Sequence, residues 1–198
     1  MNNDSDGNQM FAFQGLDYIP FGYSGALAPY IETGPGTMRA AAVLMGLADL
    51  LQDDKAADTV ICDLGCGDGE FLIGLLGHIN SVANNVSIAH GVGIDYDTGL
   101  IRTAGINSQA RGVISDWIVY DFNDDLKDLA TTLINVHRVS HVFIYLVPRQ
   151  LAMKTVRKIL TRLCESGVVL CCYKFYPDYL TPTRRDTLME LIVYDKAG

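Results

Sequence analysis

Three glycines and one carboxylate form the most specific chemical pattern in this sequence. Asp63 stands two residues before Gly65, and Gly67 and Gly69 follow at alternate positions. Glycine lets the backbone adopt a positive φ and lets a ligand approach the main chain closely. Because the first amides of a helix have no partner inside it, a helix that starts at such a turn directs them at the ligand. The pattern therefore predicts a ligand-binding turn, with a glycine turn that binds nothing as the alternative.

The spacing of the glycines discriminates between ligands. A dinucleotide-binding turn has G-x-G-x-x-G, in which the third glycine allows close packing of helix on strand. Glu70 occupies that position here. A carboxylate at Asp63 would repel a pyrophosphate, but it suits a ligand that carries a cationic amino group. An oxidoreductase that uses a nicotinamide dinucleotide is therefore disfavoured.

The segments on either side of the turn predict a strand–turn–helix–strand unit. The apolar run 59–64 is expected to be a strand, 69–79 a helix, and 89–94 a second strand that ends at Asp95 and Tyr96. This is a βαβ crossover, which joins two parallel strands. In this architecture an acid at the end of the second strand reaches the ribose hydroxyls of a bound nucleoside. We expect this role for Asp95, with a solvated strand end as the alternative.

The rest of the chain continues the alternation of strands and helices. Further strands are expected at 116–120, 139–146, 168–173 and 188–194, and helices at 38–51, 98–108, along Leu126, Leu129, Ala130 and Leu133, and from Pro148 to 165. This order predicts an α/β fold, a doubly wound, Rossmann-like, mostly parallel sheet with helices on both faces. Because the tail after the fifth strand is short, one strand at the C-terminal edge is expected to be degenerate or missing.

The length of 198 residues fits one domain with a full core. Residues 1–15 are polar and are expected to form a flexible N-terminus. Residues 16–198 are expected to form a single domain, in which 16–52 provide an arm rich in aromatic residues, proline and glycine, and then a helix.

Composition narrows the classes of partner. The net charge of −8 predicts that nucleic acid is not a partner, whereas a basic peptide would be attracted. No apolar run is long enough to span a bilayer. Asp4, Asp6 and Asp17 precede the first basic residue, Arg39, so we expect a cytoplasmic protein, with a mitochondrial location as the alternative. The five cysteines form no C-x-x-C pair and the histidines are scattered, which predicts buried reduced thiols and no metal site.

The turn Asp63-x-Gly65-x-Gly67-x-Gly69 resembles the first motif of the class I S-adenosylmethionine-dependent methyltransferases. The resemblance implies a seven-stranded sheet, S-adenosyl-L-methionine as cofactor and methyl transfer as the reaction. It also implies that Asp121 and Phe122, after the third strand, bracket the adenine. The same cluster can instead cap the next helix, and the two roles are compatible.

A narrower resemblance concerns the fourth strand. Enzymes that methylate DNA bases or glutamine carry D/N-P-P-Y/F here, whereas this chain has Tyr145-Leu146-Val147-Pro148. The Y-L-V-P form is similar to that of the small lysine methyltransferases that modify the ATP synthase c subunit and the adenine nucleotide translocase. Pro29-Tyr30-Ile31-x-Thr33 and Phe175-x-Pro177 are similar to two further segments of that family.

This narrower resemblance implies a protein-lysine N-methyltransferase whose partner is a protein with an accessible lysine. Tyr30 and Thr33 would contribute to cofactor binding, and Tyr145 and Pro148 would position the substrate. Aromatic rings around Tyr30, Tyr145 and 175–179 would receive the lysine stem and ammonium. A small-molecule methyltransferase and an inactive cofactor-binding scaffold are the alternatives, and Tyr145 can equally be a packing residue.

Overall fold

The computed structural model describes residues 34–47, 59–82, 88–123 and 128–196. The expected flexible segment 1–15 lies outside the described residues. So does the expected arm up to residue 33, including Tyr30 and Thr33 with their proposed contacts to a cofactor.

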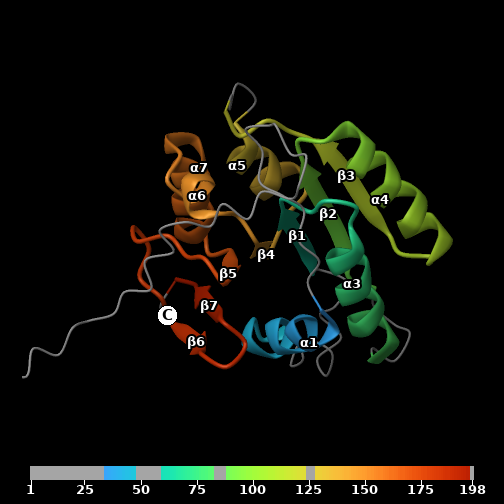
Figure 1. Cartoon of the computed structure of the whole chain (residues 1–198), viewed down its shortest axis with the longest axis horizontal. Helices are drawn as coiled ribbons and strands as arrows, with labels where there is room; N and C mark the ends of the chain where they lie inside the picture. Colours follow the sequence, from blue (N-terminus) through green and yellow to red (C-terminus); the bar gives the residue numbers. More distant parts are fainter. Residues whose placement is uncertain (1–33, 48–58, 83–87, 124–127, 197–198) are drawn as a thin grey trace, which may run out of the picture. The chain divides into compact units, whose positions relative to one another are not determined.

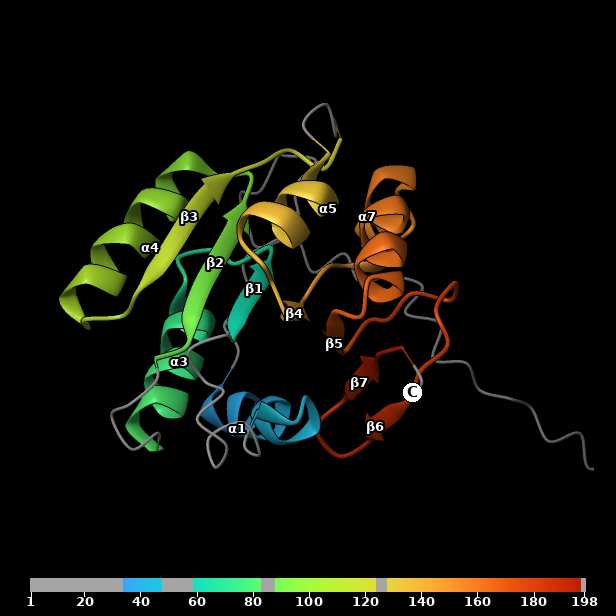
Figure 2. The ribbon, with the colours of Figure 1, turned by 180° about the vertical axis from the view of Figure 1, so that it is seen from behind.

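Seven strands form one sheet at the centre of the described chain (Figures 1 and 2). They are β1 (Val60–Leu64), β2 (His90–Asp95), β3 (Ser115–Val119), β4 (His141–Ile144), β5 (Val169–Tyr173), β6 (Arg184–Asp186) and β7 (Leu191–Tyr194). Their order is β3-β2-β1-β4-β5-β7-β6. The first five in this order are parallel, and β7 runs antiparallel to both β5 and β6. The expected doubly wound, mostly parallel sheet is confirmed.

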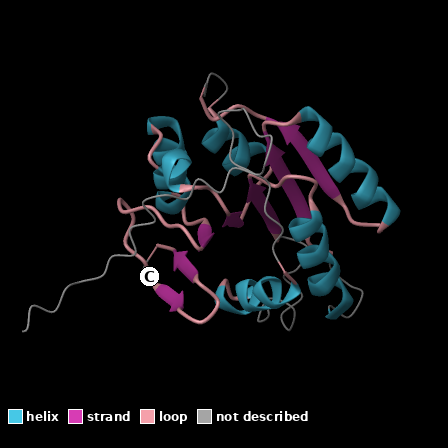
Figure 3. Ribbon diagram, viewed as in Figure 1, coloured by secondary structure: helices cyan, strands magenta, loops and turns pink. Residues whose placement is uncertain are grey.

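Helices cover both faces of this sheet (Figure 3). They are α1 (Pro35–Leu44), α3 (Glu70–Val82), α4 (Thr98–Ala110), α5 (Leu129–Thr131), which continues into the π-helix η2 (Thr132–Val136), α6 (Pro148–Leu151) and α7 (Lys154–Glu165). Strand residues alternate between the faces, as a period of two requires. Ile61 and Phe143 pack with α1 and α3, whereas Cys62 and Val142 pack with α5 and α7.

The first helix differs from its expected bounds at both ends. Gly34 is the N-cap of α1 and Pro35 is its first residue, so Thr37, which precedes the expected start at residue 38, lies buried in the first turn. Proline suits this position because its missing N–H would be unpaired there anyway. The helix ends at Leu44, and Gly46 follows with φ 78°. The expected continuation over 48–51 lies outside the described residues.

The C-terminal edge of the sheet is complete, contrary to expectation. The structure contains both β6 and β7, which pair as a hairpin with Asp186 opposite Leu191. Strand β6 was not predicted from the sequence because this strand has only three residues, two of them arginine. Residues 174–183 connect β5 to β6 without a helix.

The expected helix from Pro148 to 165 is two helices. Pro148 begins α6 at its first position, but Met153 adopts an extended conformation with ψ 137° and separates α6 from α7. The Thr155 hydroxyl then donates a hydrogen bond to the Phe122 carbonyl, which fixes the start of α7 against the loop after β3. The break therefore turns the chain at the carboxyl end of β4 before α7 runs back along the sheet.

Trp117 of β3 explains two glycines in neighbouring elements. A methyl group built on Gly93 would lie 2.1 Å from the Trp117 ring, and one on Gly69 would lie 2.4 Å from it. The indole N–H donates a hydrogen bond to the Ser108 hydroxyl of α4 at 3.0 Å. The absence of a side chain at Gly93 and Gly69 therefore makes room for the indole behind the glycine turn.

This packing can be tested with two glycine-to-alanine variants. Gly93→Ala should destabilise the protein by about 1–3 kcal/mol, because the core around Trp117 has no room for a methyl group. Gly77→Ala, in α3, has no neighbouring atom within 4 Å and should stabilise by about 0.5–1 kcal/mol. Urea denaturation followed by circular dichroism measures both. Equal stabilities for the two variants would contradict the packing.

Candidate functional site

The turn after β1 needs all three of its glycines. Gly65, Gly67 and Gly69 have φ values of 84°, 55° and 80°, a conformation that residues with side chains rarely adopt. At Gly65 a methyl group would also lie 3.0 Å from the Leu146 side chain. The alternate spacing in the sequence is therefore the spacing of the left-handed residues in the turn.

Asp95, at the end of β2, holds this turn in place. The Gly67 amide donates a hydrogen bond to Asp95 Oδ2 at 2.9 Å, and the Asp97 amide donates to Oδ1 at 2.9 Å. The Gly65 and Cys66 amides both donate to the Ile94 carbonyl. Since Asp95 is only partly buried and each carboxylate oxygen has two lone pairs, it can also accept hydrogen bonds from ligand hydroxyls. Its predicted role at a ribose stays a prediction that this position favours.

Asp63 is a carboxyl group inside the core. It is 3% exposed and lies beside Gly93 and Phe143 of the flanking strands. Burial, together with the negative charge of Asp95, raises the pKa of Asp63 to about 8. A cation that reached this carboxyl would favour its ionised form and lower that pKa. The site is therefore suited to a positively charged ligand and unsuited to a pyrophosphate.

The other residues predicted to bind the cofactor lie at the ends of β2 and β3. Tyr96 follows Asp95 and is 48% exposed. Asp121 Oδ1 accepts hydrogen bonds from the amide and the side chain of Asn123, both at 2.8 Å. Phe122 is buried against Tyr120, with ring centroids 5.9 Å apart. The predicted roles of Asp121 and Phe122 at the adenine stay predictions. The helix cap that was their alternative belongs to Asp128, the N-cap of α5.

Aromatic rings gather where β4 and β5 end. We call Tyr145, Tyr173 and Phe175 the aromatic cluster, with ring centroids 4.9 Å apart for Tyr145–Tyr173 and 6.3 Å for Tyr145–Phe175. Phe143 lies 6.4 Å from Tyr173 and connects the cluster to the core. Pro148 is exposed at the start of α6, on the same edge of the sheet. The structure thus brings Tyr145 and Pro148 to the edge where the glycine turn lies.

Lys174 follows β5 in a strained turn. Its φ is 60°, and the Phe175 amide donates a hydrogen bond to the Tyr173 carbonyl at 2.7 Å. This is a γ-turn with positive φ, a rare conformation. Lys174 also donates its amide hydrogen bond to the carbonyl of Glu190, which has φ 55°. Such residues cost on the order of 1–3 kcal/mol each and concentrate at functional sites.

The ammonium of Lys174 belongs to the aromatic cluster. Its Nζ lies 5.2 Å from the centroid of the Tyr173 ring. Burial acts to lower the pKa of Lys174, but the neighbouring phenols of Tyr145 and Tyr173 and the carboxylate of Glu190 outweigh it and raise the pKa. Burial raises the pKa of Tyr145, so its hydroxyl stays protonated at neutral pH. The rings that we expected to receive a substrate lysine already hold a cation of this chain.

The cysteines offer no reactive thiol near the turn. Burial raises the pKa of Cys66, as do the nearby carboxylates, and burial likewise raises the pKa of Cys62. Within residues 34–47, 59–82, 88–123 and 128–196, no group of His, Cys, Asp or Glu is arranged to hold a metal ion. Among the helices in these ranges, none has both the length and the apolar character to cross a bilayer.

No family model matches this chain, and no curated protein matches its sequence significantly. Solved structures match its fold. An RNA methyltransferase from Salinibacter ruber, in complex with S-adenosyl-L-homocysteine, is 24% identical and has a TM-score of 0.57 over 83% of this chain and 91% of its own. The rRNA methyltransferase aviRa from Streptomyces viridochromogenes is 12% identical, with a TM-score of 0.57 over 85% of this chain and 87% of its own.

A third match is an S-adenosylmethionine-dependent methyltransferase from Geobacter sulfurreducens, 17% identical, with a TM-score of 0.51 over 80% of this chain. The chain spans about half of that protein, 55% of its length. The chain has the class I methyltransferase fold. The strand order β3-β2-β1-β4-β5-β7-β6 and the glycine turn after β1 belong to this fold. The narrower resemblance to the small lysine methyltransferases finds no support among these structures.

The expectation that nucleic acid is not a partner was wrong, because two structures that share the fold over most of this chain are RNA methyltransferases. The prediction from net charge failed because net charge averages over the whole molecule and does not reveal a local excess of positive charge. No Asp or Glu occurs between Asp128 and Glu165, and this segment includes α6 and most of α7. In the sequence alone, such a run of cations on a helix is typical of an ordinary solvated face. Lys174 was also missed, since nothing in the sequence marks its strained turn.

Asp63 should make the stability of the protein depend on pH. Its pKa is near 3.8 unfolded and about 8 folded. Between these values the folded chain holds a proton that the unfolded chain has lost, so the free energy of unfolding falls as pH rises from about 4 to about 8. Asp63→Asn removes this dependence. Its stability relative to wild type should rise with pH, by at most about 1.4 kcal/mol per pH unit.

Urea denaturation of both proteins at several pH values measures this difference. His141 contributes a slope of opposite sign, because burial, with a contribution from Arg184, lowers its pKa to about 4. The stability that His141 gives is present above pH 6.5 and is lost as pH falls toward 4. Since both proteins contain His141, its effect cancels in the difference. A difference that does not change with pH would contradict the buried carboxyl at Asp63.

Proposed function

We propose that this chain is an S-adenosylmethionine-dependent methyltransferase that acts on RNA. Three features support the cofactor: the glycine turn with three left-handed residues, the buried carboxyl of Asp63, and Asp95 at the end of β2. The S. ruber RNA methyltransferase and the G. sulfurreducens enzyme share the fold and were solved with S-adenosyl-L-homocysteine.

The residues of the site fit the cofactor's chemical groups. S-adenosyl-L-methionine, when bound, supplies a methyl group on a cationic sulfur. Asp63 would provide the negative charge near its amino group, and Asp95 would accept hydrogen bonds from its ribose hydroxyls. The left-handed glycines allow the main chain to approach it closely. Because the methyl group is already activated, the protein has chiefly to orient the acceptor and exclude water.

The position of Lys174 is the observation that favours RNA as the methyl acceptor. Its ammonium lies over Tyr173 and beside Tyr145, at the edge of the sheet where ligands of open α/β folds bind. A cation there opposes the entry of a substrate ammonium and attracts a phosphate. The aromatic cluster offers rings on which an unstacked base can lie. Two RNA methyltransferases with the same fold agree with this assignment.

Cofactor binding can be tested by changing two neighbouring aspartates. Asp95→Ala should weaken S-adenosyl-L-homocysteine binding about tenfold or more, because it removes a charged acceptor and frees the Gly67 amide. Asp97→Ala is the matched control. Asp97 caps α4 by accepting hydrogen bonds from Gly99 and Leu100, so its loss should cost about 1 kcal/mol of stability. It should leave affinity within about twofold.

Isothermal titration calorimetry measures the affinities, and urea denaturation measures the stabilities. If wild type binds NADH and not S-adenosyl-L-homocysteine, the proposed cofactor is wrong. Equal losses of affinity in the two variants would show that Asp95 acts only through the fold.

Methyl transfer from a labelled donor tests the acceptor. Cell lysate freed of small molecules should acquire label in its RNA when wild type is added. Lys174→Gln should lower the rate of RNA labelling about tenfold, because it removes the cation and leaves the side chain's length almost unchanged. Its affinity for S-adenosyl-L-homocysteine should not change. Label on protein lysines would overturn the RNA assignment and retain the methyltransferase, and so would label that appears only after metabolites are restored. A lack of transfer to any fraction would leave a cofactor-binding scaffold.

A further inference from the structure

The positive charge of this acidic protein is concentrated on one pair of helices. Between Asp128 and Glu165 the chain has no acid, and α6 and α7 carry five basic residues there: Arg149, Lys154, Arg157, Lys158 and Arg162. Arg162 forms an ion pair with Asp128 at 2.6 Å. The other four have exposed side chains, and we call these four the basic face. This local excess of positive charge contrasts with the net charge of −8 of the whole chain.

The topology places the basic face at the carboxyl edge of the sheet, where we propose that the methyl acceptor enters. Pro148 begins α6 soon after β4 ends, so Arg149 lies at the carboxyl ends of the strands. Helix α7 then runs back toward the opposite edge, where β5 begins. Its cations Lys154, Arg157 and Lys158 occupy its first half, whereas its acid, Glu165, is its last residue. The charge is therefore graded along α7 and is most positive in its first half, toward the carboxyl edge of the sheet.

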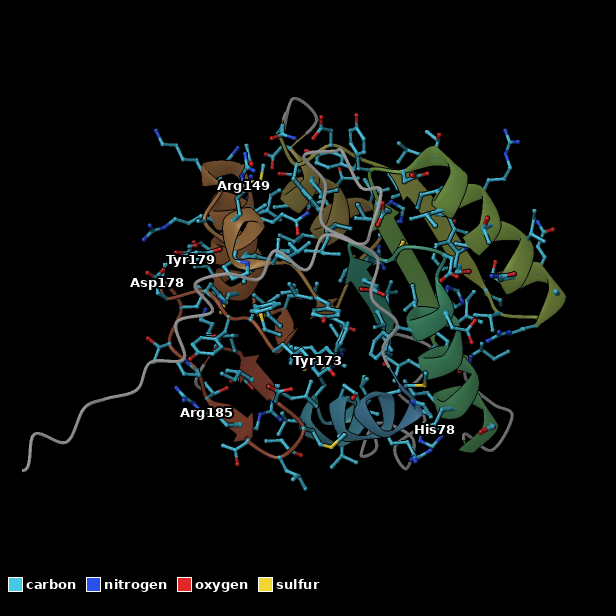
Figure 4. The ribbon with its side chains drawn as sticks, in the orientation of Figure 1. His78, Arg149, Tyr173, Asp178, Tyr179 and Arg185 are labelled. Atoms are coloured by element: carbon cyan, nitrogen blue, oxygen red, sulfur yellow. The ribbon has the colours of Figure 1, made fainter. Side chains whose placement is uncertain are left out.

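Tyr179 joins the basic face to the loop that carries Lys174. The Tyr179 hydroxyl donates a hydrogen bond to the Leu151 carbonyl at 3.0 Å, and the Arg157 guanidinium lies 4.7 Å from the centroid of its ring. Figure 4 shows Arg149 and Tyr179 on the same side of the molecule, with the acid Asp178 beside Tyr179. Loop 174–183 and the two helices are thus held together, so the basic face keeps its position relative to Lys174.

We propose that the basic face is the docking surface for the sugar–phosphate backbone of the RNA substrate. This inference rests on the proposed function and adds to it the surface that binds the acceptor. A single-stranded segment crossing α6 and the start of α7 would pair its phosphates with the basic face, while one base reaches the aromatic cluster. Phosphate contacts of this kind bind without reading sequence and fix the register of the strand. Lys174 would continue the row of cations to the transfer site.

The test compares two triple variants that remove the same charge. Arg149→Gln, Lys154→Gln and Lys158→Gln together remove three of the four charges of the basic face and leave Arg157 to hold Tyr179. The control combines Arg102→Gln, Arg138→Gln and Lys196→Gln, which are exposed cations elsewhere on the chain. Fluorescence anisotropy with a short labelled single-stranded RNA of mixed sequence gives the affinity over a range of salt concentrations.

Wild type should bind this RNA with a salt-dependent affinity. The basic-face variant should lose about tenfold or more in affinity, and the slope of log K against log salt should shrink by about 2, since each lost contact to a single strand contributes about 0.7. The control variant should keep the wild-type slope. Asp178→Asn should act in the opposite direction and tighten binding about twofold. Both triple variants should bind S-adenosyl-L-homocysteine as wild type does, which shows that they are folded.

Two results would overturn the docking surface and leave the proposed function intact. In one, wild type methylates RNA but the basic-face variant retains the wild-type affinity and slope. In the other, both triple variants lose affinity and slope equally, so that total charge and not its location matters. A different result would contradict the proposed function itself. If wild type transfers label to protein or to a small molecule and not to RNA, RNA is not the acceptor, and the docking surface falls with that assignment.

Discussion

The hydrogen bond from the Gly67 amide to Asp95 is the constraint on which the site depends. It joins the turn after β1 to the end of β2, so that two adjacent parallel strands position one loop. The loop donates this bond from Gly67, which is left-handed, as are Gly65 and Gly69 on either side of it. Trp117 fills the space behind it, which the absence of a side chain at Gly93 leaves open. The glycine turn, Asp95 and Trp117 thus form one structural unit, and we expect a substitution at any of these positions to disturb the other two.

The two halves of the sheet carry different charge. At β1 and β2 the carboxyl groups of Asp63 and Asp95 lie close to the glycine turn, and burial, followed by the negative charge of Asp95, raises the pKa of Asp63. At β4 and β5 the carboxyl edge carries Lys174 and, on the following helices, the basic face. A cationic ligand at the glycine turn and an anionic ligand at the basic face would therefore meet opposite fields on parts of the same edge. Such a separation would let a chain of net charge −8 bind the polyanionic substrate that we propose for it.

Local patterns in the sequence predicted the turn and most of the sheet. The spacing of Gly65, Gly67 and Gly69 is a backbone requirement, and the apolar strands reflect burial on both faces, so both are visible in the residues themselves. The features that sequence missed depend on distant contacts. The left-handed Lys174 is held by the Glu190 carbonyl, and α7 starts where Thr155 meets the Phe122 carbonyl. β6 has three residues and exists because β7 lies beside it.

Trp117 is the one tryptophan in the chain, and its place behind the glycine turn gives the protein a built-in optical reporter. Its indole contacts the positions of Gly69 and Gly93 and donates its N–H to Ser108, so the tryptophan emission of the protein comes from one defined surrounding. A ligand that tightens or displaces the turn alters the polarity and quenching around this ring. The occupancy of the site can therefore be followed by intrinsic fluorescence, without a label and in the native chain.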